Sequence, residues 1–342
     1  MSDLRIIVII PTFNSAEDIE ECLKSIIALK LNSVRLIVGD NNSRDNTVEI
    51  IKRNYPHVFV SQNSDNYGYA AGCNIGFGSV DSDYVVFINA DTSTKDNWIY
   101  EGISRMEDNT SIGAFQPKIL LYSDRCRISS TGNMANFLFF GWANEYGEFD
   151  SLDGEMRRIA FASGAAAIYR TSYLKRIGCF DESFFMYGED LDLGLRLFIS
   201  GFDSVYSSER SIYHKYIFKE SPGKYSLLER NRLISLLKIY EWTTLLWIAP
   251  AFVISEVGVI TKAFQEKWVK EKMESYLSVM SQIKSILRKR NFIKLTRKRT
   301  DNELIAFLEG GLRFSGFDAN SSINRGNYFL DKYKEFLSRL RL

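Results

Sequence analysis

The segment FFMYGEDLDLGLRL, residues 184–197, places three carboxylates within four positions of one another, beside aromatic and aliphatic residues. These acids are Glu189, Asp190 and Asp192. A carboxylate among apolar side chains loses hydration, so its pKa rises and it becomes a stronger base. Acids also stabilise the first turn of a helix, and Asp192 stands four residues before Arg196, the spacing of a helical ion pair. We therefore predict a structural role for Asp192 and a chemical one for Asp190.

Two other acids follow short apolar runs that have the composition of buried strands. The runs RIIVII, VRLIVG and YVVFIN, at residues 5–10, 34–39 and 84–89, are rich in β-branched residues, which is typical of a parallel sheet. The segments between them have helical patterns, so the chain begins with a βαβαβ arrangement. Asp40 comes directly after the second run and Asp91 shortly after the third. Open parallel sheets bind ligands at the carboxyl ends of their strands, so we expect both acids on one ligand-binding edge.

The turn after the first strand, PTFN at residues 11–14, lacks the glycines of a dinucleotide-binding loop. A G-x-G-x-x-G loop would bind a diphosphate through its backbone amides. Without that loop, the charge of a bound diphosphate needs another neutralising group. A divalent cation held by Asp91 is the simplest candidate.

Composition limits the class of protein. The 342 residues are 45% hydrophobic, enough to fill the core of one large α/β domain and an appendage. A formal charge of +1 argues against a general polyanion-binding protein. The four cysteines include no C-x-x-C pair, which argues against a zinc site or a disulfide framework and favours a reducing cytoplasm. The N-terminal residues show no signal-peptide pattern.

Beyond residue 225 the sequence is rich in Leu, Ile, Lys and Arg, which predicts a domain over 1–225 and a helical region over 226–342. The most apolar run, 245–254, is interrupted by Pro250, so we expect a segment that is interfacial or buried between helices rather than membrane-spanning. Residues 284–299 contain eight Lys or Arg and no acid. This run favours contact with an anionic membrane surface, with a solvated helix face as the alternative and no nucleic-acid partner expected.

Five motifs occur in one order: VIIPTFN, VGDNNSRDNT, NSDNYGYAAGCNIG, VVFINADT and GCFDESFFMYGEDLDLGLRL. Together they resemble the family 2 glycosyltransferases, and within these the rhamnosyltransferase-like branch, over residues 4–240. The resemblance implies an α/β GT-A (Rossmann-like) fold with a mostly parallel sheet flanked by helices, to which this chain adds its helical extension. It also implies an inverting sugar transfer from a nucleoside-diphosphate sugar, assisted by Mg²⁺ or Mn²⁺.

The resemblance assigns roles to single residues. Positions that match the donor's base and ribose pocket are Pro11, Thr12, Asn14 and Asp40. Positions that match the segment closing over the nucleotide are Asn66, Gly68 and Asn74, although Gly68 could equally serve a turn. Asn89 and Asp91 stand where the family has its D-x-D metal motif, with Asn89 a weaker ligand than a carboxylate.

The remaining assignments concern the metal and the reaction. His214 matches a metal-binding histidine of related enzymes, although a lone histidine at a strand end is more often structural. The pair Glu189 and Asp190 matches the family's catalytic acids, with Asp190 as the general base that takes the proton of the acceptor hydroxyl.

The resulting hypothesis is a cytoplasmic enzyme, peripheral on the inner face of the cell membrane, that uses dTDP-rhamnose or a UDP-sugar and a glycan or lipid-linked acceptor. One alternative is a sugar-1-phosphate nucleotidyltransferase, which would need a glycine-rich loop where this chain has PTFN. Another is a non-catalytic glycan- or nucleotide-sugar-binding protein, which only Asn89 favours. The sequence leaves the sugar, the acceptor, the linkage and the oligomeric state open.

Overall fold

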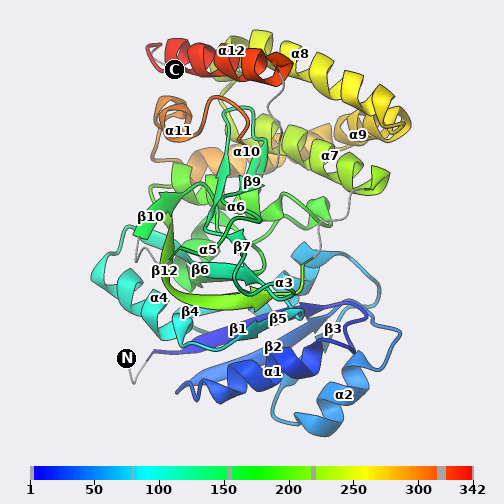
Figure 1. Cartoon of the computed structure of the whole chain (residues 1–342), viewed down its shortest axis with the longest axis vertical. Helices are drawn as coiled ribbons and strands as arrows, with labels where there is room; N and C mark the ends of the chain where they lie inside the picture. The colour runs from blue at the N-terminus through cyan, green and yellow to red at the C-terminus, as the bar shows by residue number, and fades with distance from the viewer. Residues whose placement is uncertain (1–3, 79–80, 152–155, 217–220, 314–320, 341–342) are drawn as a thin grey trace. The chain divides into compact units, whose positions relative to one another are not determined.

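The computed structural model shows a chain that divides into two compact units (Figure 1). It describes residues 4–78, 81–151, 156–216, 221–313 and 321–340. The first unit comprises Met1–Asn133, Ala143–Leu197 and Phe202–Ile217. The second comprises Met134–Trp142, Phe198–Gly201 and Phe218–Leu342. The sequence predicts a single boundary after residue 225, whereas the second unit also takes two short pieces from within the first 225 residues.

The first unit is built on one large sheet with the strand order β10-β12-β6-β11-β4-β1-β2-β3. The strands of the chain are β1 Ile6–Thr12, β2 Val34–Asp40, β3 Phe59–Gln62, β4 Tyr84–Ile88, β5 Thr92–Thr94, β6 Ile112–Leu121, β7 Ile128–Ser130, β8 Asn133–Ala135, β9 Gly141–Ala143, β10 Met156–Ile159, β11 Ala166–Arg170 and β12 Asp203–His214. The three strands predicted from apolar runs are confirmed as β1, β2 and β4, with β1 parallel to both others.

Strand direction decides which ends meet at the site edge. β11 pairs antiparallel with both β4 and β6, so β6 points the same way as β4. β12 is parallel to β6, and β3 is parallel to β2. The carboxyl ends of β1, β2, β4, β6 and β12 therefore lie along one edge of the sheet. The short strand β5 folds back from this edge and pairs antiparallel with the end of β12.

Both faces of the sheet are covered by helices, which explains the continuous apolar strands. One core joins alternate strand residues such as Val8 to α1 (Ile19–Ala28), α2 (Thr47–Asn54) and α4 (Trp98–Asp108). The other core joins the opposite residues, such as Ile9, to three further helices. These are α3 (Tyr69–Phe77), α5 (Thr171–Ile177) and α6 (Glu189–Ile199), and a short 3-10 turn, η1 (Glu182–Phe184), precedes α6. The fold class predicted from the sequence, an α/β sheet flanked by helices, is confirmed.

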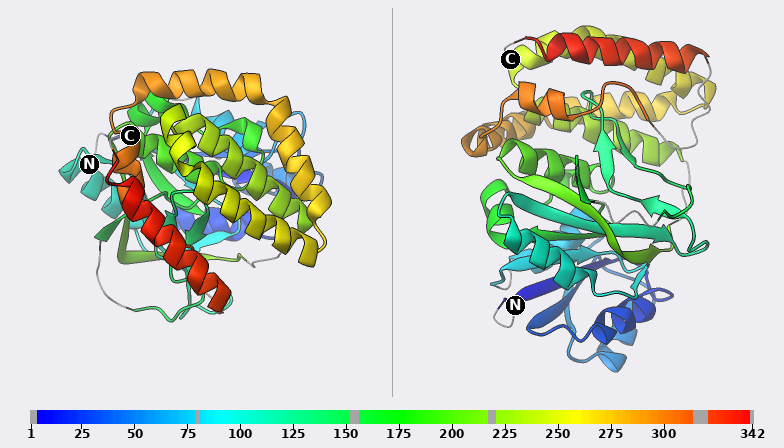
Figure 2. Two further views of the ribbon diagram at one scale, coloured as in Figure 1. Left: turned by 90° about the horizontal axis from the view of Figure 1, so that it is seen from above. Right: turned by 60° about the vertical axis from the view of Figure 1, so that its left-hand side comes forward.

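The second unit is helical, as the sequence predicts for the region beyond residue 225 (Figure 2). Its helices are α7 Pro222–Ile239, α8 Trp242–Gln265, α9 Val269–Ser281, α10 Ile283–Thr296, α11 Asp301–Phe307 and α12 Ser321–Leu337. Pro250 does not end the helix, because α8 continues through it. The expectation that this run is buried between helices is wrong, since only 22% of the most apolar window of α8 is buried.

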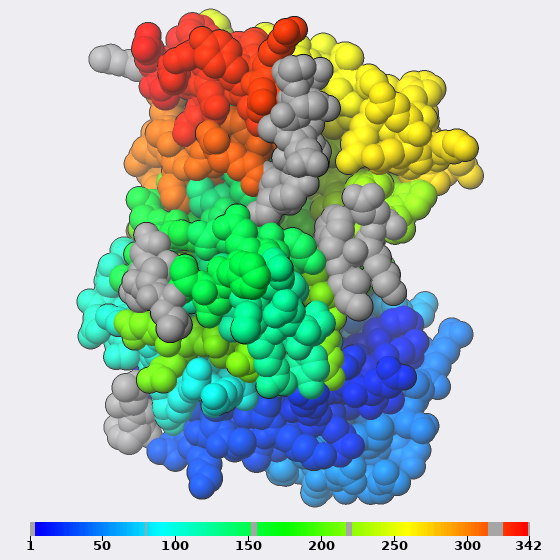
Figure 3. Space-filling view, viewed as in Figure 1, coloured from blue at the N-terminus to red at the C-terminus, as the bar shows by residue number. Residues whose placement is uncertain are grey.

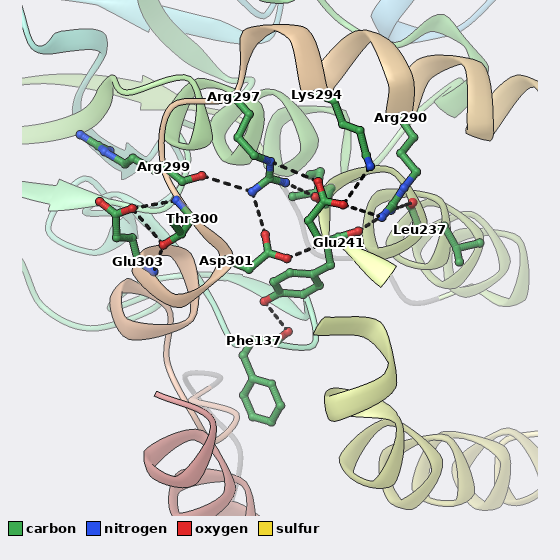
Figure 4. A network of polar contacts seen from close by, with 12 residues as sticks. Phe137, Leu237, Glu241, Arg290, Lys294, Arg297, Arg299, Thr300, Asp301 and Glu303 are labelled. Atoms are coloured by element: carbon green, nitrogen blue, oxygen red, sulfur yellow. Dashed lines mark hydrogen bonds and ion pairs between the residues drawn. The ribbon is translucent and has the colours of Figure 1, made fainter. Parts of the chain in front are cut away.

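The basic run at residues 284–299 is partly internal, which the sequence did not predict (Figure 4). Arg290 donates to the carbonyl oxygens of Leu237, at 2.7 Å, and Tyr240. Arg297 donates to the carbonyl oxygen of Ile239. These are the last carbonyls of α7, which lack partners within their own helix. At least these two cations therefore cap α7 and are not part of a solvated basic face.

Candidate active site

The ends of β1 and β2 are joined by a buried acid. Asp40 is fully buried, and its Oδ1 accepts a hydrogen bond from the Thr12 hydroxyl at 3.0 Å. Its carboxylate also accepts from the backbone N–H of Ser43 at 3.0 Å and from the Gln62 amide at 3.2 Å. The sequence places Asp40 against the nucleotide. In the structure its oxygens are occupied by these partners, so it fixes the turns that follow both strands.

The turn after β1 is tied to the loop after β2 through Asn14. Its backbone N–H donates to the Ser43 hydroxyl at 2.9 Å, and its side-chain oxygen accepts from the backbone N–H of Arg44 at 2.8 Å. Asn14 has a positive φ of 52°. Pro11 is buried beneath the same turn. Of the four residues predicted to contact the donor's base and ribose, only Asn14 is exposed to solvent.

Asp45 is a second acid at this edge that sequence reasoning missed. It accepts from the backbone N–H of Ala16 at 3.0 Å and from the hydroxyl of Thr47 at 2.5 Å. Burial alone would raise the pKa of Asp45, but these hydrogen bonds bring it below its usual value. The acid lies within the quoted motif VGDNNSRDNT, and its position before a helix could have indicated it.

The segment around Gly68 packs against the loop that precedes Glu189 and Asp190, the candidate catalytic acids. Asn66 accepts from the N–H of Gly68 at 2.9 Å, and Asn41 donates to the carbonyl oxygen of Gly68 at 3.0 Å. Gly68 has a φ of +85°, and a Cβ there would lie 2.2 Å from the carbonyl oxygen of Phe185. Glycine is therefore required at this position both by conformation and by space.

Asn74, the third residue predicted to close over the nucleotide, faces inward instead. Its amide donates to the carbonyl oxygen of Phe180 at 2.8 Å and to the Glu182 carboxylate at 3.0 Å. Its side-chain oxygen accepts from the N–H of Phe180 at 3.2 Å. Asn74 thus anchors the segment that leads to α6, and its contact with a nucleotide stays a prediction.

The candidate metal ligands come together where β5 pairs with β12. The register places Thr92 opposite His214, so His214 meets Asp91, the residue before β5. Asp91 Oδ1 lies 3.2 Å from His214 Nε2, but the two are not aligned as a hydrogen bond. Burial would raise the pKa of Asp91, yet the neighbouring His214 and Lys215 hold it below its usual value. The carboxylate is therefore ionised at neutral pH.

The side chains present fit a divalent cation. Two buried atoms that could bind a metal, Asn89 Oδ1 and His214 Nε2, have no hydrogen-bond partner. Together with Asp91 they offer amide, imidazole and carboxylate ligands, which suit Mg²⁺ or Mn²⁺. Within the described ranges, no three His, Cys, Asp or Glu side chains form a metal cluster. A cation here would need further oxygen ligands from a bound diphosphate or water.

The catalytic candidates stand at the start of α6, after a loop of left-handed residues. Phe185, Tyr187 and Gly188 have φ values of 63°, 68° and 78°. Asp190 is half-buried and accepts from the N–H of Leu191 at 2.8 Å and of Gly164 at 3.3 Å. Burial raises its pKa to about 6, against the opposing effect of these backbone hydrogen bonds.

The two neighbouring acids, Glu189 and Asp192, are both buried but differ in their partners. Glu189 is buried and has one oxygen without a hydrogen-bond partner. Burial, and then the charge of Asp190, raise the pKa of Glu189 well above its usual range, which favours the neutral carboxyl. Asp192 is also buried, but Arg196 donates to it at 2.8 Å. The structural ion pair predicted for Asp192 is confirmed.

The two residues before β11 connect Asp190 to the metal candidates. Gly164 donates to Asp190, and the next residue, Ala165, accepts from the N–H of Asn89 at 3.0 Å. Tyr69 donates to the carbonyl oxygen of Gly164 at 2.6 Å. The structure therefore brings Asp190, Asn89, Asp91 and His214 to one region. It places Asp40 and Asn74 in supporting positions. Tyr69 was missed because nothing local in its motif indicates a partner 95 residues away.

Comparison with solved structures supports the fold. Staphylococcus aureus TarS, residues 1–349, superposes with a TM-score of 0.56 over 98% of this chain and 90% of that TarS chain, at 17% identity. GalNAc-T7, solved with UDP, GalNAc and Mn²⁺, gives a TM-score of 0.58 over 80% of this chain and 54% of that protein, at 14% identity. Identities this low show a shared fold and no more.

Curated relatives share more of the sequence. The N-acetylglucosaminyl-diphospho-decaprenol L-rhamnosyltransferase of Mycobacterium tuberculosis is 26% identical over 242 residues, covering 63% of this chain and 76% of the relative. The poly-β-1,6-N-acetyl-D-glucosamine synthase of Staphylococcus aureus is 27% identical over 199 residues, covering 57% of this chain and 46% of the synthase. The family model of glycosyl transferase family 2 matches residues 7–178, half of the chain, and the protein therefore belongs to this family of glycosyltransferases.

Proposed function

We propose that the protein transfers a sugar from a nucleoside-diphosphate sugar to a hydroxyl of a glycan or lipid-linked acceptor, with inversion at the anomeric carbon. The observation that carries this proposal is Asp190, a half-buried carboxylate with a pKa of about 6, joined through Gly164 and Ala165 to the strand end that bears the metal candidates. A base with a pKa near the working pH is both ionised and able to accept a proton.

In this mechanism Asp190 takes the proton of the acceptor hydroxyl while that oxygen attacks the anomeric carbon. The new carbon–oxygen bond forms as the bond to the diphosphate breaks, and the nucleoside diphosphate leaves with the electron pair. The N–H groups of Gly164 and Leu191 hold the carboxylate in place. Glu189 is buried and its raised pKa favours the neutral form, so we assign it a role in positioning α6 and the base.

A divalent cation would be held by Asp91 and His214, with the amide oxygen of Asn89 as a further ligand. When bound, it would neutralise charge on the diphosphate of the donor. Asp91 is ionised for this task, and the pairing of β5 with β12 keeps His214 beside it. Mg²⁺ and Mn²⁺ both suit these ligands, and the structure of GalNAc-T7 with Mn²⁺ supports the second.

The donor region would be the turns after β1 and β2, with Asn14 exposed beside Thr12 and Asp40, and the Gly68 segment adjacent. dTDP-rhamnose is our first candidate because the mycobacterial relative is named a rhamnosyltransferase. UDP-sugars follow, because TarS has been solved with UDP and with UDP-GlcNAc. The same relative's name includes a decaprenol diphosphate, which supports a lipid-linked acceptor and a cytoplasmic enzyme on the inner face of the membrane.

The test is a donor screen on the purified protein with Mn²⁺ or with EDTA. It would measure thermal stabilisation and donor hydrolysis with dTDP-rhamnose, UDP-glucose, UDP-N-acetylglucosamine and GDP-mannose. We expect one donor to stabilise the protein only when metal is present. Asp91→Asn should abolish that stabilisation, whereas the exposed acid Asp108, changed to Asn, should not alter it. Donor-induced stabilisation that is as large in EDTA as in Mn²⁺, and as large in Asp91→Asn as in wild type, would contradict the proposed metal site.

A further inference from the structure

Helix α8, yellow in Figure 3, carries a stripe of large apolar side chains that the protein leaves largely exposed. These side chains follow the helical repeat and therefore share one face. They are Trp242 at 49%, Leu246 at 76%, Trp247 at 46%, Val253 at 59%, Ile254 at 53%, Val257 at 61% and Phe264 at 68% exposure, and the Trp247 ring also contacts Phe336 of α12. All 24 residues of α8 are described, and its two charged residues, Glu256 and Lys262, are not on this stripe. An apolar surface of this length, about 33 Å from Trp242 to Phe264, marks an interaction site.

The opposite face of α8 is fixed to the bundle by buried charges. Glu256 forms ion pairs with Arg232 of α7 and, at 2.8 Å, with Lys272 of α9. Glu229 of α7 also pairs with Arg232 at 2.7 Å. All four side chains are at least nine-tenths buried. Removing Glu256 from this network would leave buried cations without partners, which is costly.

This network argues against a membrane-spanning α8. The helix is long and apolar enough to cross a bilayer by length and composition. A spanning arrangement would have to carry Glu256 into the hydrocarbon and separate it from Arg232 and Lys272. A helix that stays on the bundle and offers only its outer stripe keeps all three charges paired.

The net charge differs between the two parts of the sequence, and this difference favours an anionic partner for the C-terminal part. From residue 226 onward the sequence has 21 Lys and Arg against 12 Asp and Glu, a net charge of +9. The preceding 225 residues have 22 against 30, a net charge of −8. On α9 and α10, exposed apolar side chains such as Leu277 and Leu295 accompany the exposed cations Lys270, Lys284 and Arg288. An apolar stripe on a cationic unit is complementary to an anionic lipid surface.

We propose that the outer stripe of α8 inserts into the interface of an anionic bilayer, with the helix parallel to the membrane plane. This extends the membrane association of the proposed function to a named face, and it rests on that proposal only for the biological setting. A second copy of the chain could also cover the stripe, but it would bring together two C-terminal regions, residues 226–342, each of net charge +9. The charge therefore favours lipid over self-association.

The test is flotation of the full-length protein with vesicles of phosphatidylcholine, with and without an equal share of phosphatidylglycerol. We expect binding that needs the anionic lipid and weakens as salt is added. The double variant Val253→Glu, Val257→Glu should lower the partition coefficient at least tenfold. Phe59→Glu is the matched control, because Phe59 is 55% exposed on β3 of the first unit and should bind like wild type.

Three results would overturn the proposal. The first is a wild-type protein that does not bind anionic vesicles, and the second is a double variant that binds them as well as wild type. The third is a wild-type dimer that the double variant converts to monomer in light scattering without any vesicle binding, which would assign the stripe to a second copy. Donor hydrolysis without vesicles should be unchanged in the double variant, so failure here is distinguishable from failure of the transferase proposal.

Depth of insertion separates an interfacial helix from a spanning one. Trp247 lies on the stripe, so brominated lipids should quench its fluorescence when the bromine is near the headgroup and much less when it is at the chain end. Replacing both exposed tryptophans of α8, Trp242→Phe together with Trp247→Phe, should remove most of this quenching. Strong quenching from the bilayer centre would contradict a helix that lies in the interface.

Discussion

Two pairs of carboxylic acids, one at the start of α6 and one in the helical unit, show how the same group can serve two purposes. Among the residues that the structure describes, Glu189 and Asp190 have no cation as a hydrogen-bond or ion-pair partner, and burial raises the pKa of both. In the helical unit, burial would also raise the pKa of Glu229 and Glu256, but Arg232 and Lys272 hold both below their usual values. A compensated acid is held ionised and supports the fold, whereas an uncompensated one remains available to exchange a proton.

The largest effect that this comparison predicts is on turnover. Asp190→Asn removes the base and keeps the volume and the side-chain oxygen, so kcat should fall by roughly 10²–10⁴-fold. Donor-induced thermal stabilisation should remain, because the donor contacts other residues. Activity within a few fold of wild type would show that Asp190 is not the base.

The next effect concerns the compensated pair. Arg232→Met leaves Glu229 and Glu256 with fewer positive partners in a buried place, so the free energy of unfolding should fall by about 3–5 kcal/mol. Urea denaturation followed by circular dichroism measures it. Lys270→Met is the control, because its side chain is 84% exposed and the change should stay within about 0.5 kcal/mol. Equal effects of the two substitutions would mean that burial does not distinguish them.

The uncompensated acid should destabilise the fold at high pH. The pKa of Asp190 is raised from 3.8 to about 6 on folding, so stability is fully present below about pH 4 and is lost as the pH rises through 6. Asp190→Asn cannot ionise, so it should be more stable than wild type by about 2–3 kcal/mol at pH 8 and gain nothing at pH 4. A difference in melting temperature that is independent of pH would contradict this assignment.

The same pKa should shape the activity. The base must be deprotonated, so kcat/KM should fall about tenfold per pH unit below pH 6. Donor transfer measured across this range, with folding checked at each pH, tests the slope. A flat profile between pH 5 and 8 would mean that another group accepts the proton.

The smallest effect should come from Glu189. Burial raises the pKa of its carboxyl and favours the neutral form, which Glu189→Gln imitates in charge and shape. We expect kcat to change by less than about threefold. A loss as large as that of Asp190→Asn would show that Glu189 ionises during the reaction and that the two acids share one proton.

The sequence predicted features that depend on local pattern. Strands β1, β2 and β4 have continuous β-branched runs, and Asp192 with Arg196 has a helical spacing. Features that depend on distant pairing could not be predicted from local pattern. Without the family resemblance, nothing near His214 indicates that β12 will pair with β5, which lies about 120 residues earlier, and so reach Asp91.

Side-chain direction was also beyond the sequence. Asp40 and Asn74 lie in motifs of the family, but whether each faces a ligand or its own backbone depends on packing that only the fold determines. The same holds for the basic run, in which Arg290 and Arg297 turn toward the end of α7. The course of α8 through Pro250 is a further case, because a proline inside an apolar run locally indicates a break that the fold does not make.

The second unit is assembled from three separate segments of the sequence, and this limits where the gene can be divided or recombined. Residues 134–142 belong to that unit, where Phe139 stacks on Tyr240 at 4.7 Å and Phe137 accepts a hydrogen bond from the Tyr240 hydroxyl at 2.9 Å. A gene cut near codon 225 would leave these two buried phenylalanines without their cover. The helical unit is therefore not a detachable module, and exchange of such units between genes would have to carry this insertion along.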